Sequence, residues 1–153
     1  MQPVQFDHEK LEVYQLQLRL LGWVAELLEH VQGSKLRRVA ETMDQLDRAS
    51  LSVLLNIAEG NGRRNSQQRV RFFDDARGSG TECAACLDAL VAKGAVTPER
   101  MAEGKAMLIR VVAMLSKLIE RVEGNLALRE EDGNSRRSTS TRTRTRSNGS
   151  RER

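Results

Sequence analysis

Two cysteines spaced by two residues, Cys83 and Cys86, are the first side chains in this sequence that could do chemistry. A CxxC pair can ligate zinc or form a redox-active disulfide. Zinc takes four ligands, however, and the only histidines, His8 and His30, stand alone in the sequence. A thioredoxin-like site needs a strand before the motif, whereas this pair lies inside a helical pattern. We therefore expect two packed core thiols, with no metal and no cofactor.

A cluster of arginines is the second candidate. Five fall within fifteen residues: Arg63, Arg64, Arg69, Arg71 and Arg77. Beside the expected start of a helix, the first four could bind an anion such as a nucleic-acid phosphate. The alternative is structural, with Arg77 partly buried next to Phe73 and Gly80 and paired with Glu59 or Glu82. We favour the structural interpretation, because networks of charged side chains commonly serve packing.

Familiar catalytic motifs are missing from the sequence. It contains no P-loop, GxGxxG, HExxH or nucleophile elbow. No pair of acid and base, nucleophile or complete metal set can be assembled from it. We therefore expect a protein without enzymatic activity.

The elements that would position these residues are four helical segments, near 7–32, 34–59, 66–93 and 97–123. Apolar residues recur at spacings of three and four in each of them. The first segment carries two such sets. One is Leu11, Tyr14, Leu18, Leu21, Ala25 and Leu28, and the other is Val13, Leu16, Leu20, Val24, Leu27 and Val31.

Helix ends are marked by capping residues. Asp7, Ser66 and Thr97 are expected N-caps, and Gly33 and Gly94 are expected C-terminal glycines. Long helices with short connections predict an all-α fold, an antiparallel up-down four-helix bundle over residues 1–132.

Two features predict self-association. The second half of the second helix, 51–58, is apolar on most sides. In the third helix, the two glycines of the patch Gly78-Ser79-Gly80 lower the helix propensity. Close packing by another helix would offset this loss.

The C-terminal segment differs in composition from the rest. Residues 133–153 hold seven arginines and one glutamate, which leaves 18 basic and 20 acidic side chains in residues 1–132. Without apolar residues this segment is expected to be a disordered, Arg/Ser/Thr-rich tail. Its arginines are further candidates for binding nucleic acid: Arg136, Arg137, Arg142, Arg144 and Arg146.

The N-terminal sequence lacks the basic start and apolar stretch of a secretory signal. The longest uncharged run, 49–58, is too short to span a bilayer. With thiols and no signal, we expect a cytoplasmic protein without membrane contact.

Four stretches of the sequence carry a family resemblance. They are LEVYQLQLRLL at 11–21, LDRASLSVLLNIAEG at 46–60, NIAEGNGR at 56–63 and RFFDDARGSGTE at 71–82. Over residues 6–123 the chain resembles the four-helix-bundle proteins encoded in intervening sequences of 23S rRNA genes, often labelled S23 ribosomal proteins. The usual proline of the family's central block is replaced by Leu54. The resemblance implies a ring-like homopentamer and no catalytic role.

More distantly, the chain is similar to the accessory protein of diversity-generating retroelements, a pentamer that binds reverse transcriptase and nucleic acid. Carried over by position, the family's marked residues are Arg48, Asn56, Glu59, Gly60, Gly62, Arg63, Phe73, Arg77, Gly78, Ser79 and Glu82. We expect Gly60 and Gly62 to be turn residues with positive φ. Asn56, on an apolar helix, needs a buried hydrogen-bond partner near the corner between the second and third helices.

Two functional hypotheses follow from the sequence. The first is a self-assembling bundle associated with rRNA or another nucleic acid. The alternative is a structural or protein-adaptor oligomer, for example a partner of a reverse transcriptase, with no direct RNA role.

Overall fold

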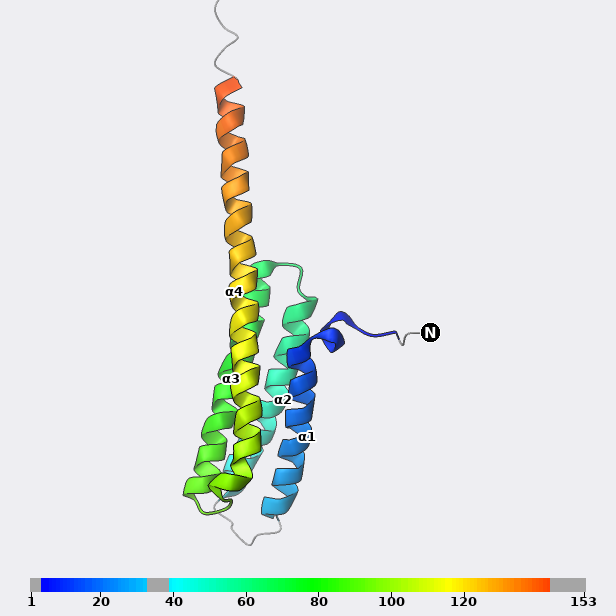
Figure 1. The fold of residues 1–153 in the computed structure, drawn as a ribbon, viewed down its shortest axis with the longest axis vertical. Helices are drawn as coiled ribbons and strands as arrows, with labels where there is room; N and C mark the ends of the chain where they lie inside the picture. Colours follow the sequence, from blue (N-terminus) through cyan, green and yellow to red (C-terminus); the bar gives the residue numbers. More distant parts are fainter. Residues whose placement is uncertain (1–3, 33–38, 144–153) are drawn as a thin grey trace, which may run out of the picture.

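The protein is a bundle of four long helices preceded by one short turn of 3-10 helix. The computed structural model describes residues 4–32 and 39–143, with the side chains of 4–31 and 39–131. The elements are η1 (Asp7–Lys10), α1 (Glu12–Gln32), α2 (Ala40–Gly62), α3 (Ser66–Ala92) and α4 (Pro98–Thr143). Successive helices run in opposite directions, as Figure 1 shows. The predicted antiparallel four-helix bundle is therefore confirmed.

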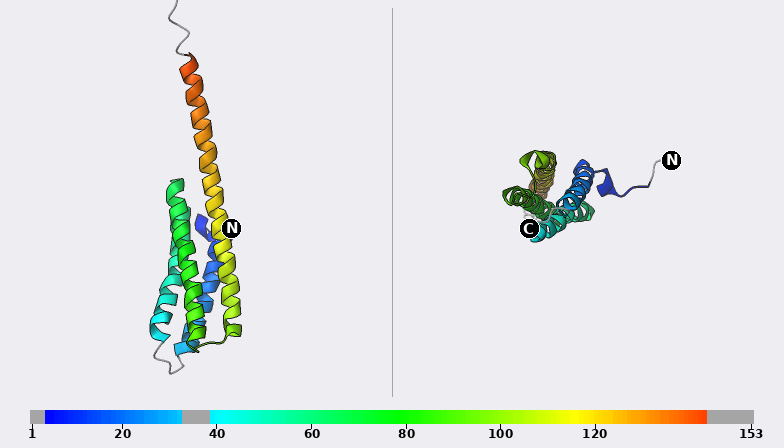
Figure 2. Two further views of the ribbon diagram at one scale, coloured as in Figure 1. Left: turned by 90° about the vertical axis from the view of Figure 1, so that its left-hand side faces the viewer. Right: turned by 90° about the horizontal axis from the view of Figure 1, so that it is seen from below.

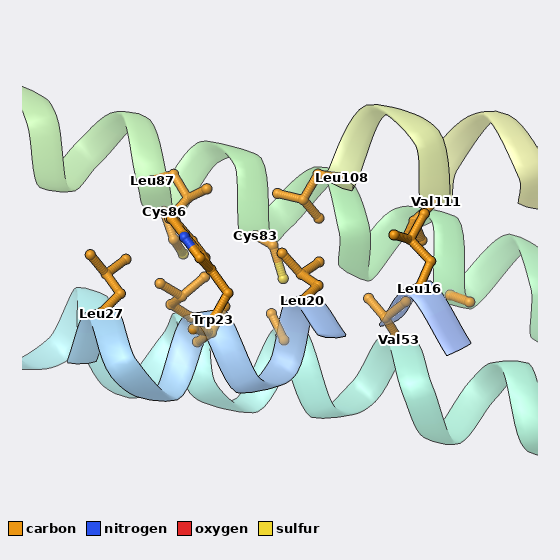
Figure 3. Close-up of a cluster of buried hydrophobic side chains, with 14 of the residues drawn as sticks. Leu16, Leu20, Trp23, Leu27, Val53, Cys83, Cys86, Leu87, Leu108 and Val111 are labelled. Carbon is orange, nitrogen blue, oxygen red and sulfur yellow. The ribbon is translucent and has the colours of Figure 1, made fainter. Parts of the chain in front are cut away.

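The core runs the length of the bundle and takes residues from all four helices. The cluster includes Leu16 and Leu20 from α1, Val53 from α2, Leu87 from α3 and Val111 from α4 (Figure 3). Each is no more than 1% exposed. The stripes of the four helices are thus joined in one hydrophobic cluster, which fixes where their outer faces lie.

The two apolar sets of α1 have different environments. The set that contains Val13, Leu16 and Leu20 is buried in the core. The other set flanks the core: Tyr14 and Leu21 are half-buried, and Leu18 is 45% exposed. Part of the apolar surface that the sequence places on α1 is thus uncovered in the single chain.

Two of the predicted helix ends, at Gly94 and Thr97, are confirmed. Gly94 follows α3 with φ of +71°, and Thr97 Oγ1 accepts from the Arg100 N–H at 3.3 Å. The cap of α3 is Asn65 rather than Ser66, because the Asn65 carboxamide accepts from the Gln68 N–H at 2.9 Å. The expected cap Asp7 does not begin α1, because it lies in η1, and Gly33 lies outside the described residues.

The prediction for Gly60 and Gly62 is wrong. Both lie inside the last turn of α2, and in the described part of the chain only Gly94 has a positive φ. The connection to α3 is made by Arg63, Arg64 and Asn65 instead. No left-handed residue is needed there, because Arg63 leaves the helix in extended conformation, with φ of −77° and ψ of 133°.

The fourth helix is longer than predicted. α4 has 46 residues and projects beyond the end of the bundle (Figures 1 and 2), although its buried face ends at Val122. Leu128 to Glu131 are exposed but are good helix formers, so backbone hydrogen bonds suffice to continue the helix. The helix therefore crosses the predicted boundary between residues 132 and 133. The side chains of Arg136, Arg137 and Arg142, and all of Arg144 and Arg146, lie outside the described residues.

Candidate functional site at the α2–α3 corner

The corner between α2 and α3 is built on contact between Gly60 and Phe73. Both residues are buried, and a Cβ placed on Gly60 would lie 2.8 Å from Phe73 Cε1. Only a residue without a side chain lets the ring approach α2 this closely. The glycine is therefore required by close packing between the helices rather than by the turn.

Two arginines lie over the aromatic rings of the corner. The guanidinium carbon of Arg63 is 5.0 Å from the Phe72 ring centre, and that of Arg69 is 5.9 Å from the Phe73 ring centre. Arg63 also pairs with Glu59, one turn back in α2. Arg69 is half-buried, and its Nε has no hydrogen-bond partner among the described residues. These contacts fix where both guanidinium groups lie.

Arg64 and Arg71 differ from these two arginines. Both are exposed, and neither forms an ion pair with any acid in the described ranges. The arginine cluster thus divides into two residues held by packing and two that extend into solvent.

The predicted buried pair of Arg77 with Glu59 or Glu82 is wrong. Arg77 pairs with Asp74 on its own helix at 2.7 Å, and the two side chains are 45% and 56% exposed. Positions 74 and 77 are neighbours on the surface of one helix, which makes this short-range pair easy to form. Arg77 therefore does not fix the register of two helices.

Arg48 and Glu82 instead belong to a polar bridge between α2 and α3. The Arg48 guanidinium donates to Gln45 Oε1 at 2.8 Å, and Gln45 Nε2 donates to Glu82 Oε1 at 2.5 Å. The bridge lies in the groove between the two helices, where Thr42 and Cys86 are also found. Two residues that the family resemblance marks are thus joined through Gln45, which the sequence did not single out.

Asn56 finds its partners on its own helix. Its Nδ2 donates to the Ser52 carbonyl at 3.0 Å and contacts Ser52 Oγ at 3.2 Å. Ser52 Oγ is in turn 3.0 Å from Ser79 Oγ on α3. Asn56 thus has a hydrogen-bond partner, but a half-buried one that lies one turn before the corner, and the hydroxyl pair makes the link to α3.

The three residues of the small-residue patch lie in different environments. Gly80 is buried, and a Cβ placed there would lie 3.2 Å from Val112 Cγ2 on α4. Ser79 faces α2, and Gly78 is exposed with open space around it. The close approach that we predicted thus occurs within one chain, between α3 and α4. Beside Gly80 lies a groove of about 410 Å³ between the two helices. Its lining includes Ala84, Leu108 and Ile109.

Both cysteines are buried and form no disulfide, as expected for core residues. Burial raises the pKa of Cys83 to about 12, with Cys86 and Glu82 acting in the same direction. Burial also raises the pKa of Cys86. Both therefore remain thiols near neutral pH and are poor nucleophiles.

Two interior contacts were missed from the sequence. Trp23 on α1 is packed against Gly104 on α4, where an added Cβ would lie 2.3 Å from the ring. Gln17 is completely buried, and its Nε2 donates to the Ser50 carbonyl on α2 at 2.8 Å. A glycine inside the fourth helical pattern was the available signal for the first contact. A glutamine within an apolar set was the signal for the second.

In the described residues, no group of three or more His, Cys, Asp or Glu side chains is placed to hold a metal ion. Among the described helices, none combines the length and the apolar composition that a membrane span requires.

Similarity to known proteins identifies the family. The model of the family described as 23S rRNA-intervening sequence protein matches residues 9–117. A comparison with curated protein sequences finds no match. The chain is also similar to the crystal structure of a protein of unknown function of the S23 ribosomal protein family from Bacteroides thetaiotaomicron. The two share 16% sequence identity with a TM-score of 0.62, over 70% of this chain and 97% of that chain.

The structural match at this level of identity concerns the fold, which the two proteins share. The match to the family model is one of sequence, and it includes the corner from Asn56 to Glu82 and most of the bundle. On this evidence the chain belongs to the 23S rRNA-intervening sequence protein family.

Proposed function

We propose that this protein is a non-enzymatic, cytoplasmic helical bundle that assembles with copies of itself and works in association with RNA. The observation that carries the proposal is an uncovered apolar surface across α1 and α2. The family name connects related proteins to 23S rRNA, and the two buried thiols favour a reducing compartment.

The apolar surface, called here the outer stripe, consists of Tyr14, Leu18, Leu21, Leu51 and Leu55. Three of its leucines are 45% to 57% exposed: Leu18, Leu51 and Leu55. Leu18 and Leu51 directly follow Gln17 and Ser50, whose hydrogen bond joins α1 to α2. They therefore lie on the same outer side of this helix pair. A contiguous apolar surface of this kind is typical of an interaction site.

Light scattering coupled to size-exclusion chromatography tests self-assembly. We expect the wild type well above 17.2 kDa, the mass of one chain. Leu51→Gln/Leu55→Gln should shift it towards the monomer, because polar groups would be buried in the interface without partners. The matched control is Ile109→Gln, which changes a residue that is 70% exposed on the α3–α4 side. A wild-type monomer at micromolar concentration would contradict the proposal, as would equal effects of both variants.

The RNA association draws support from the C-terminal arginines. In an oligomer several copies of this segment would act together, which raises their effective concentration at a polyanion. Deletion of residues 133–153 should leave bundle and oligomer intact, because the described core ends at Val122. RNA affinity should fall, and its dependence on salt should weaken by about 0.7–0.9 log units per lost phosphate contact. Equal binding by both proteins at low salt would exclude this segment as an RNA-binding arm.

The second candidate function is a protein adaptor, such as a partner of a reverse transcriptase. It is favoured by the excess of acidic over basic side chains in residues 1–132. Filter binding of rRNA fragments to the full-length protein separates the two. Retention that decreases steeply with salt supports RNA association, and no retention at low salt supports the adaptor.

A further inference from the structure

We propose that Arg63, Arg64 and Arg71 form a phosphate-docking face at the α2–α3 corner, through which the bundle contacts the backbone of RNA. This inference rests on the proposed RNA association and assigns it a place on the folded domain. The three residues are called the corner arginines below.

The corner arginines differ in how firmly they are held, but all three have N–H groups that a phosphate can reach. Arg64 and Arg71 are exposed and form no ion pair in the described parts of the chain. Arg63 is 43% exposed, and among the described residues its guanidinium pairs with Glu59 through Nη2 alone. Its position over Phe72 limits its motion and leaves other N–H groups for a ligand. Less rotamer freedom is lost on binding by a guanidinium that is already held in place.

All three lie at the α2–α3 corner. Arg63 and Arg64 belong to the connection between the helices, and Arg71 lies in the second turn of α3. The guanidinium of Arg63 lies over Phe72, the residue that directly follows Arg71. Arg69 lies about 200° around α3 from Arg71, over Phe73, so we assign it to packing.

The direction of α4 makes RNA the favoured partner. Figure 1 shows that α4 leaves the bundle at the end where α2 meets α3. The chain that continues from there contains Arg136, Arg137 and Arg142. A strand of RNA can contact both regions, because its phosphates repeat at short intervals along its length. A compact acidic patch on a protein does not offer this reach.

Acidic residues limit the face at one side. Asp74 is engaged with Arg77, whereas Asp75 forms no ion pair with a described base. Asp75 lies one turn beyond Arg71 and on the same side of α3. An RNA phosphate near Arg71 would be repelled by this carboxylate. Removal of its charge should therefore strengthen binding.

The test is fluorescence anisotropy with a fluorescein-labelled RNA hairpin of 23S rRNA sequence and the full-length protein. Arg64→Gln/Arg71→Gln should weaken binding by about tenfold and reduce the salt slope by about two. Asp75→Asn should change binding in the opposite direction, by about twofold to threefold. The matched control Arg19→Gln/Arg100→Gln removes the same charge from the α1–α4 face. Thermal melts and light scattering check that all variants keep fold and oligomeric state.

Each outcome distinguishes the inference from the function on which it rests. Loss of binding in the corner variant alone, together with the gain from Asp75→Asn, supports the docking face. Equal losses in corner and control variants would overturn it, because binding would then follow net charge. If the corner variant binds the hairpin as tightly as the wild type does, the docking face is overturned but RNA association stands. If the wild type does not bind the hairpin at low salt, RNA association fails and the docking face with it.

Discussion

Gly60 in α2 and Gly104 in α4 each allow an aromatic ring from another helix to reach their backbone. An added Cβ would lie 2.8 Å from Phe73 at Gly60 and 2.3 Å from Trp23 at Gly104. Gly60 and Phe73 lie on either side of one short turn, so a local motif contains both. Gly104 and Trp23 belong to the last and the first helix, and no local motif connects them. Two contacts of the same kind can thus differ completely in how visible they are in the sequence.

The largest expected effect is that of Gly104→Ala. The new methyl group would overlap Trp23 Cη2 and Cζ3, and a ring held between α1 and α4 cannot move aside cheaply. We expect a loss of about 3 kcal/mol in the free energy of unfolding, measured by urea denaturation. The matched control is Gly22→Ala on α1, where no atom lies within 4 Å and the helix should gain stability. Equal stability of both variants would mean that Trp23 does not exclude a side chain from position 104.

Gly60→Ala should have the next largest effect. Its methyl group would meet Phe73 Cε1 at 2.8 Å and Phe72 Cβ at 3.0 Å, and we expect a loss of about 2 kcal/mol. Phe73→Leu should recover part of this loss when combined with Gly60→Ala. A double-mutant cycle in urea measures that coupling. Strictly additive effects would mean that the ring is not what excludes a side chain from position 60.

Gly78→Ala changes a glycine that no aromatic ring approaches. Gly78 is exposed in the middle of α3, and an added Cβ meets no atom within 4 Å. The substitution should raise stability by about 0.5–1 kcal/mol, because alanine favours the helix. A higher melting temperature with an unchanged oligomer would confirm this. If the oligomer dissociates instead, Gly78 belongs to an interface between copies.

Arg77→Ala should have the smallest effect. Its exposed pair with Asp74 is worth about 0.2–0.5 kcal/mol, and no buried charge is left behind. The melting temperature should therefore change by no more than a few degrees. The loss of several kcal/mol expected for a buried pair would contradict the exposed geometry.

Periodicity was enough to predict the fold, because four segments with 3–4 spacing and capped ends allow few arrangements. It could not tell which of the two apolar sets of α1 enters the core, since both have the same spacing. That choice depends on the positions of α2 and α4, and it leaves Leu18 exposed. Periodicity also could not predict where α4 ends, because the last turns of that helix contain no apolar residues.

The corner was located correctly from its residues, but several of their contacts were not. The choice of Asp74 as partner of Arg77 depends on side-chain distance within one helix, whereas Glu59 is engaged by Arg63. The role of Gly60 depends on a ring that approaches from α3. The sequence shows that a glycine or a charge is present. Only the packing of the helices decides what it contacts.

The length of α4 has a consequence for how the protein moves in solution. At 1.5 Å per residue its 46 residues extend over about 69 Å, whereas the 23 residues of α2 extend over about 35 Å. Such an elongated particle experiences more friction than a sphere of equal mass. It therefore elutes early from a sizing column and sediments slowly for its mass. Column calibration with globular standards would thus assign too many copies to any assembly of this chain, and only a method that reads mass directly gives the number.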